Sequence, residues 1–439
     1  MKNLNKLFSI IIFFSIFSCA SNVDLHSAFV YDVKNGNYEL VYSTLEQSSK
    51  NYYSNHDDVL QMLDLGLLAH YSDFPESSIN YLNRAESLIE ENYSKSISQN
   101  ISSYILNDNV IDYAGEEYED IYVNLFKCLT FISQENYESA FVEIRRFNNK
   151  LKSLSVKYQE QISKIKEESK MEDDSLNSEN YKVQFYDSVF ARYLSMLLYL
   201  YEGDVDSAKI DYNYLVSAFD TQKKLYNFSF PKQIEENFYT TKNDARLNVV
   251  AFSGMAPRRK EESISNIYYG YKIALPVMYE INSEVDSIKL VAINQDTKTV
   301  YQKDFEKIES ISNIAVDTFK QKQSLIYTKS LARSLMKSVT TDIFKEISEE
   351  AENSDTAALF ELLHFTSLIA NQITEVADIR TSKYFPSSVF ISGIDLPVGN
   401  YDIIVTYFSS DETEVSRKVF NDYDVSKNKL NLLEAVCLK

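Results

Sequence analysis

The sequence predicts an α+β protein: an N-terminal all-α, tetratricopeptide-like (TPR-like) helical array followed by a C-terminal α+β domain with an antiparallel or mixed sheet. Apolar residues recur at helical spacing up to about residue 240 and alternate along short segments after it. Only 8 glycines and 6 prolines in 439 residues favour helices over a loop-rich fold, and 44% hydrophobic residues supply a sizeable core. We therefore divide the chain into residues 1–18, 19–240 and 241–439.

The first residues predict export. Lys2 and Lys6 precede an apolar run from Leu7 to Phe17, which is too short to span a bilayer and fits the apolar region of a signal peptide. Ser18-Cys19 follows this run. A cysteine after a small residue at such a place resembles a bacterial lipoprotein signal, which implies cleavage before Cys19 and lipidation of its sulfur and its new amine.

Two features qualify this resemblance. Phe17 is bulky where a small residue is usual, so an ordinary secretory signal and an uncut anchor stay open as alternatives. Ala20 follows the cysteine, whereas in lipoproteins an Asp there often means inner-membrane retention. We therefore expect a protein of the cell envelope that is attached to the outer membrane through lipid on Cys19.

The predicted helical array consists of a repeated pattern: a helix, a short turn and a second helix. The pattern covers residues 27–50, 59–90, 113–151 and 189–219. An aromatic residue, or another apolar residue in its place, follows the turn of each unit, at Tyr38, Phe74, Tyr137 and Val205. Repeats of about 34 residues fit these positions when insertions at 94–114 and 164–182 are allowed. Such arrays leave a concave face, which we expect either to bind a protein or to be filled by the array's own insertions.

The C-terminal half alternates between strands and helices. Strands are predicted at residues 247–252, 271–276, 287–293, 298–305, 388–392, 402–407, 415–420 and 430–438. Leu331 to Ile347 forms an amphipathic helical stripe, and Ser354-Asp355 can cap a further helix. This half is therefore predicted to be an α+β domain.

Five blocks of the sequence carry a family resemblance. They are LDLGLLAHY (63–71), DYAGEEYEDIYVNL (112–125), EIRRFNNKL (143–151), FSGMAPRRKE (252–261) and ADIRTSKYFPSSVFIS with LPVGNYDI (377–403). Their order resembles a family of uncharacterised bacterial lipoproteins with TPR-like helices. Members often have Trp near the last block, where this chain has Tyr384. The resemblance implies an envelope scaffold and supplies no reaction.

The sequence predicts no catalytic residue, metal site or cofactor. The four histidines are not clustered, and there is no glycine-rich phosphate loop or nucleophile elbow. Carboxylate pairs such as Glu116-Glu117 and Glu349-Glu350 are expected to be solvated. Cys128 is expected to be a core thiol, with a Cys128–Cys437 disulfide left open.

One cationic group stands out in a chain of net charge −20. Arg258, Arg259 and Lys260 follow a predicted strand, and we expect a loop that contacts an anionic ligand or partner. The alternative is pairing with Glu261, Glu262 and neighbouring acidic helices.

These observations predict a membrane-anchored, non-enzymatic protein-binding or assembly module whose partners are unidentified envelope proteins. The acidic surface argues against nucleic acid. A regulator of a cell-wall enzyme and an envelope hydrolase without a recognisable motif are the alternatives.

Overall fold

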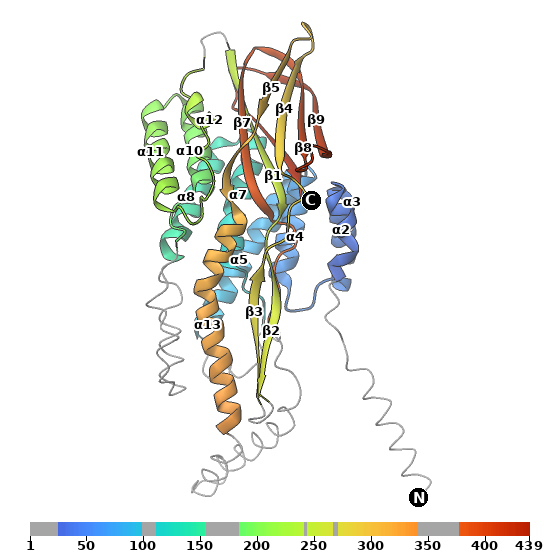
Figure 1. The fold of residues 1–439 in the computed structure, drawn as a ribbon, viewed down its shortest axis with the longest axis vertical. Coiled ribbons are helices and arrows are strands. Elements are labelled where there is room, and N and C mark those ends of the chain that lie inside the picture. Colours follow the sequence, from blue (N-terminus) through green and yellow to red (C-terminus); the bar gives the residue numbers. More distant parts are fainter. Residues whose placement is uncertain (1–24, 99–110, 155–183, 241–243, 267–270, 340–376) are drawn as a thin grey trace, which may run out of the picture.

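The computed structural model describes residues 25–98, 111–154, 184–240, 244–266, 271–339 and 377–439 (Figure 1). Helices occupy the described chain up to residue 236, and strands begin at residue 244. One long helix lies between the strands of the C-terminal part. The predicted mixed α+β class is confirmed.

The N-terminal part is a row of helices that pair through short turns. They are η1 (Leu25–Phe29), α2 (Val30–Lys34), α3 (Tyr38–Ser48), η2 (Ser49–Asn51), α4 (Asp58–Tyr71), α5 (Pro75–Ser98), α7 (Glu117–Ser133), α8 (Tyr137–Leu154), α10 (Val189–Glu202), α11 (Val205–Thr221) and α12 (Gln233–Glu236). The predicted helix–turn–helix segments thus form the pairs α2–α3, α4–α5, α7–α8 and α10–α11.

The turns inside these four pairs share one backbone geometry. Each contains a residue in the left-handed region: Gly36, Asp73, Glu135 or Gly203. In each, the next N–H donates to the carbonyl five positions earlier, as in Asn37 to Asp32, Phe74 to Ala69, Asn136 to Phe131 and Asp204 to Tyr199. This is the Schellman arrangement that satisfies the last carbonyls of a helix. The four helix pairs therefore close with the same motif despite their different sequences.

The C-terminal part contains two four-stranded sheets and a separate hairpin. Its elements are β1 (Asp244–Met255), β2 (Arg258–Asn266), β3 (Tyr271–Tyr279), β4 (Ser287–Asn294), β5 (Val300–Asp304), β6 (Glu306–Ser310), α13 (Ile311–Val339), β7 (Pro386–Pro397), β8 (Gly399–Phe408), β9 (Glu414–Val425) and β10 (Asn431–Cys437). The inner sheet has the order β10-β1-β7-β6 and is mixed, because β1 and β10 are parallel. The outer sheet has the order β5-β4-β8-β9 and is antiparallel. β2 and β3 pair only with each other in the described sheets.

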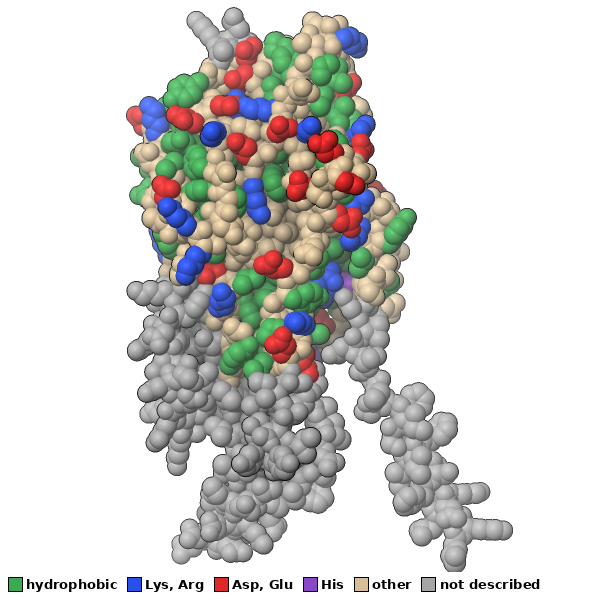
Figure 2. All heavy atoms as spheres, in the orientation of Figure 1, with side chains coloured by type: hydrophobic (Ala, Val, Ile, Leu, Met, Phe, Trp, Pro, Cys, Tyr) green, Lys and Arg blue, Asp and Glu red, His purple; other side chains and the backbone are tan. Residues whose placement is uncertain are grey.

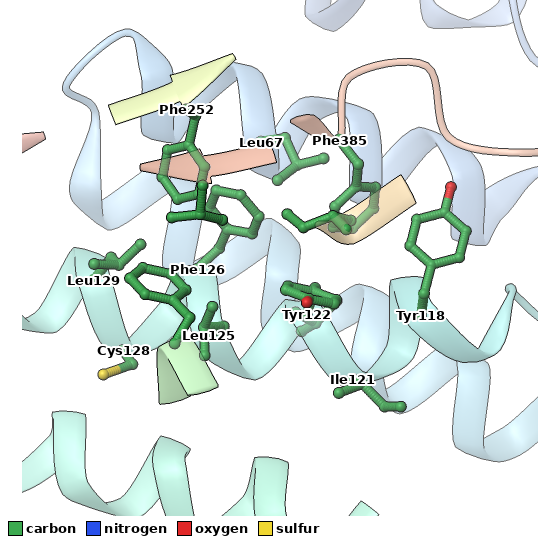
Figure 3. Packing of buried hydrophobic residues seen from close by; sticks show 14 of the residues in the cluster. Leu67, Tyr118, Ile121, Tyr122, Leu125, Phe126, Cys128, Leu129, Phe252 and Phe385 are labelled. Carbon is green, nitrogen blue, oxygen red and sulfur yellow. The ribbon is translucent and has the colours of Figure 1, made fainter. Parts of the chain in front are cut away.

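The inner sheet is covered on both faces. One face of β1 packs with β8 of the outer sheet through residues such as Val249 and Ile403. The other face meets the helices, where Phe126 of α7 lies 5.3 Å from Phe252 of β1 and 5.8 Å from Phe385 between ring centroids (Figure 3). β1 is consequently buried along nearly its whole length, as strands covered on both faces are.

The inner sheet packs against one side of the helical array. α4, α7 and α10, the first helices of their pairs, face this sheet through His70, Phe126 and Phe190. A C-terminal sheet, which neither expectation for the concave face included, therefore covers part of these helices. One apolar cluster also continues across the predicted boundary between residues 240 and 241.

Several local predictions need correction. Residues 258–266 were expected to begin as a loop but form β2, and β6 was not predicted. β3 continues through Pro276 to Tyr279, which its unpaired side permits. α13 begins at Ile311, well before the predicted stripe, and packs along β3 and α7 (Figure 1). The helix predicted after Ser354 lies outside the described residues.

Candidate functional site

Asp64 of α4, Glu119 of α7 and Ser382 form a buried cluster that we call the acidic clasp. Asp64 Oδ1 accepts hydrogen bonds from the Ser382 hydroxyl at 2.6 Å and from the Lys383 N–H at 3.1 Å. Its Oδ2 accepts from the Tyr53 hydroxyl at 3.0 Å. The carboxylate thereby ties α4 to the segment that enters β7.

Glu119 holds the same segment from the other side. Its Oε1 accepts from the Ser382 N–H at 2.6 Å, and its Oε2 accepts from the Glu116 N–H at 2.8 Å and the Tyr113 hydroxyl at 2.7 Å. The bond to Glu116 is half of a capping box that begins α7. The backbone and the hydroxyl of one serine therefore bind carboxylates from two different helices.

Both carboxylates are buried without a cation in contact. Neither forms an ion pair among the described residues, and both are almost fully buried. Burial raises the pKa of Asp64 to about 7, although its hydrogen bonds act in the opposite direction. Burial likewise raises the pKa of Glu119 to about 7, against the effect of its donors and of the Lys322 and Lys383 charges. The clasp therefore takes up or releases protons near neutral pH.

A buried ion pair lies beside the clasp. Glu116 pairs with Arg259 of β2 and, at 3.0 Å, with Lys322 of α13. Arg259 also donates to the Asp378 carbonyl at 2.9 Å, and its guanidinium lies over the Phe319 ring. Glu116 and its neighbour Glu117 were expected to be solvated, but both are buried. The burial of Glu116 is compensated because it supplies the counter-charge for Arg259 and Lys322.

The predicted cationic loop is not a loop and is not a common surface. Arg258 begins β2, and only 5% of Arg259 is exposed, since Arg259 is held by Glu116. Arg258 is partly buried, with its guanidinium 3.6 Å from the Met255 sulfur. Lys260 is exposed and pairs with Glu262 at 3.3 Å. The expected loop is therefore wrong, and buried Arg259 is not exposed for the expected partner contact.

A further buried carboxylate joins the two halves of the chain. Glu309 of β6 accepts hydrogen bonds from the hydroxyls of Tyr122, Ser188 and Tyr226 and from the Phe190 N–H. Burial raises its pKa above the ordinary range of a carboxyl group. No ion pair of Glu309 occurs within the described ranges, so hydroxyl and backbone donors alone compensate its burial.

Thr130, His70 and Glu434 are arranged like a hydroxyl–imidazole–carboxylate relay. His70 lies 2.8 Å from the Thr130 hydroxyl through Nδ1 and 2.8 Å from Glu434 through Nε2. However, Thr130 is 1% exposed and its hydroxyl donates to the Phe126 carbonyl. The arrangement therefore connects α4, α7 and β10 and offers no accessible nucleophile.

Four of the five resemblance blocks converge on the clasp and its neighbouring ion pair. Asp64, Glu119, Arg259 and Ser382 come from blocks 63–71, 112–125, 252–261 and 377–403. The fifth block, 143–151, supplies Glu143, which binds the Asn124 side-chain amide of α7 at 2.7 Å. Residues that looked like separate motifs thus form the polar interior of one body.

The remaining predicted site features are absent or untested in the part of the chain that the structure describes. Cys19 lies outside it. Cys128 and Cys437 are both free and buried, so the possible disulfide is not formed, and burial raises the pKa of each thiol. No described group of three His, Cys, Asp or Glu residues could hold a metal ion. None of the described helices combines the length and the apolar character needed to cross a membrane.

Comparison of the chain with protein-family models, curated proteins and solved structures found no match.

Proposed function

We propose that the chain is a lipid-anchored, non-enzymatic binding or assembly module of the cell envelope, built on degenerate TPR-like helix pairs. The shared Schellman turns support the repeat interpretation, since four dissimilar helix pairs close in the same way. Burial of the strongest candidate groups for chemistry, Asp64, Glu119 and the Thr130–His70 pair, supports a non-enzymatic role.

The anchor would hold the body close to the membrane. Only a short segment separates Cys19 from η1, and six residues span at most about 20 Å when fully extended. η1 is fixed to the body because His26 lies 3.0 Å from the Tyr384 hydroxyl and its ring lies 5.1 Å from that of Tyr53. Lipid on Cys19 would therefore keep the docked η1 within about 20 Å of the membrane, with the outer membrane as the expected site.

The observation that carries the binding proposal is the outer face of α11. The second helices of the two preceding long pairs, α5 and α8, each pack against the first helix of the next pair. On α11, by contrast, the side chains of Ile210 and Tyr214 are 55% and 51% exposed. These residues are one helical turn apart and share a face. Apolar side chains lie among charged ones on the side of the molecule where Figure 1 places α10 and α11 (Figure 2). We propose that an envelope protein contacts this face.

Site-specific photo-crosslinking in intact cells tests the proposal. A photoreactive residue at position 210 or 214 should give the same discrete adduct, and one at exposed Asp220 on another side of α11 should not. Ile210→Lys should remove the adduct formed from position 214. The proposal is wrong if neither position gives an adduct, or if the full-length protein hydrolyses envelope glycan or peptide.

A further inference from the structure

The acidic clasp joins three segments through a single residue. Ser382 donates through its hydroxyl to Asp64 at 2.6 Å and through its N–H to Glu119 at 2.6 Å. Because both acceptors bind one serine, the two carboxylates lie on either side of it and close to each other. Ionisation of both would place two negative charges in one buried site, which is unfavourable.

We propose that Asp64, Glu119 and Ser382 act as a pH-responsive latch, which holds residues 377–385 against α4 and α7 when the carboxyl groups are protonated and loosens this segment when they ionise. This inference is independent of the proposed binding function. It concerns how the buried carboxyl groups of the clasp respond to a change in pH.

Three cations near the clasp are engaged by other acids. Lys322 of α13 and Arg259 of β2 pair with Glu116. Arg380 pairs with Asp378 at 2.9 Å and with Asp57 at 3.3 Å. Within the described ranges, the two clasp carboxylates therefore have hydrogen-bond donors but no paired cation.

The other charged and titratable groups around the clasp modulate it without neutralising it. Lys383 of the held segment lowers the pKa of both carboxyl groups through its charge, and its N–H binds Asp64. Arg258 of β2 faces Tyr118. Other titratable groups near the clasp include the hydroxyls of Tyr53, Tyr71, Tyr113, Tyr118 and Tyr384 and the imidazole of His26. For both Asp64 and Glu119, burial raises the pKa by more than these groups lower it.

The direction of the pH dependence follows from the raised pKa values of about 7. Between the ordinary carboxyl pKa and about pH 7, the closed clasp binds more protons than an opened one. Closure is therefore most favourable in acid and weakens as the pH rises through about 7. Loosening would reach residues 377–385 and, through Tyr384, the docking of His26 in η1.

Hydrogen exchange of the full-length protein, measured by mass spectrometry, tests the latch. After correction for intrinsic exchange rates, amides of residues 377–385 should lose at least about tenfold in protection between about pH 5 and about pH 8. Amides of β8, in the outer sheet, should change much less. Equal protection at both pH values would overturn the proposal.

Asp64→Asn is the decisive variant. Its carbonyl oxygen can keep the Ser382 and Lys383 bonds, and its NH₂ can donate to the Tyr53 oxygen, so the geometry is preserved while one titration is removed. The part of the pH dependence that comes from Asp64 should disappear in this variant, leaving that of Glu119, and the full pH dependence should persist in Asp220→Asn, which changes an exposed acid on α11. An unchanged pH dependence in Asp64→Asn contradicts the latch.

Ser382→Ala supplies a second readout that keeps the proposal falsifiable if Asp64→Asn does not fold. The variant removes the hydroxyl donor of Asp64 and keeps the N–H donor of Glu119. Because that hydroxyl stabilises the ionised form, the pKa of Asp64 should rise further and the midpoint of loosening should move to higher pH. A midpoint that stays in place or falls overturns the assignment of Asp64 as the titrating group.

Discussion

Glu309→Ala tests whether a single buried carboxylate holds the helices on the strands. The Glu309 oxygens accept from Tyr122 at 2.5 Å, Ser188 at 2.7 Å, Phe190 at 3.1 Å and Tyr226 at 2.9 Å. Alanine leaves these four buried donors without their acceptor, and each such donor costs about 1–3 kcal/mol. We therefore expect the free energy of unfolding to fall by at least about 4 kcal/mol, a large part of the 5–15 kcal/mol typical of a folded protein.

Glu309→Gln is the matched control. The amide oxygen can accept from the Phe190 N–H and the Tyr226 hydroxyl, while the NH₂ donates to the hydroxyl oxygens of Tyr122 and Ser188. The loss should therefore stay below about 1.5 kcal/mol. Because burial raises the pKa of Glu309, the folded wild type loses stability as this carboxyl ionises, and Gln does not. The free energy of unfolding of the glutamine variant should therefore increase relative to that of the wild type as the pH rises.

Urea unfolding followed by circular dichroism measures both effects from the midpoint and the slope. Alanine and glutamine variants of similar stability would refute the hydrogen-bond argument, because the two differ mainly in their ability to replace the carboxylate. A loss below about 1 kcal/mol for alanine would show that the four donors find other acceptors.

Three further predictions follow from the anchor, the helix pairs and the buried ion pair. Cys19→Ser should abolish labelling by a fatty-acid analogue, and persistent label would show that the lipid is elsewhere or absent. Ala140→Trp should lower the free energy of unfolding, measured in urea, by about 1–3 kcal/mol or more, because Ala140 is fully buried where α8 begins. An unchanged unfolding midpoint would place Ala140 at the surface. Arg259→Glu should cost about 3–5 kcal/mol, because it sets a second acid beside buried Glu116. Exposed Lys260→Glu should cost less than about 1 kcal/mol, and equal losses would contradict the burial of Arg259.

The helix pairs could be predicted because their determinants are local. Periodic apolar residues define each helix, and turn residues such as Gly36 and Gly203 supply the left-handed backbone that ends it. Their packing onto the inner sheet could not be predicted in this way. The contact between Phe126 and Phe252 depends on residues from opposite parts of the chain, and both simply look like core aromatics in the sequence.

The clasp was missed for a similar reason, although the sequence held one signal. Asp64 interrupts an otherwise apolar stretch of α4, where a charged residue must find partners inside the protein. Its partner Ser382 is 318 residues away, in a block whose sequence gives no sign of a contact with α4. The cationic group was misjudged because Arg258 to Glu262 are all charged, so both faces of β2 carry charges and the alternation of a strand is hidden. Its partner Glu116 is also remote in the sequence.

Three buried acids share a role that apolar contacts cannot fill. Asp64, Glu119 and Glu309 each accept from hydroxyl and backbone donors on other elements, and none has an ion pair among the described residues. Apolar surfaces such as those around Phe126 tolerate small shifts, whereas a carboxylate bound by three or four fixed donors requires each donor to be in place. These acids therefore specify how the helices sit on the strands. Burial raises the pKa of all three, so ionisation of these acids as the pH rises lowers the stability of the arrangement that they define.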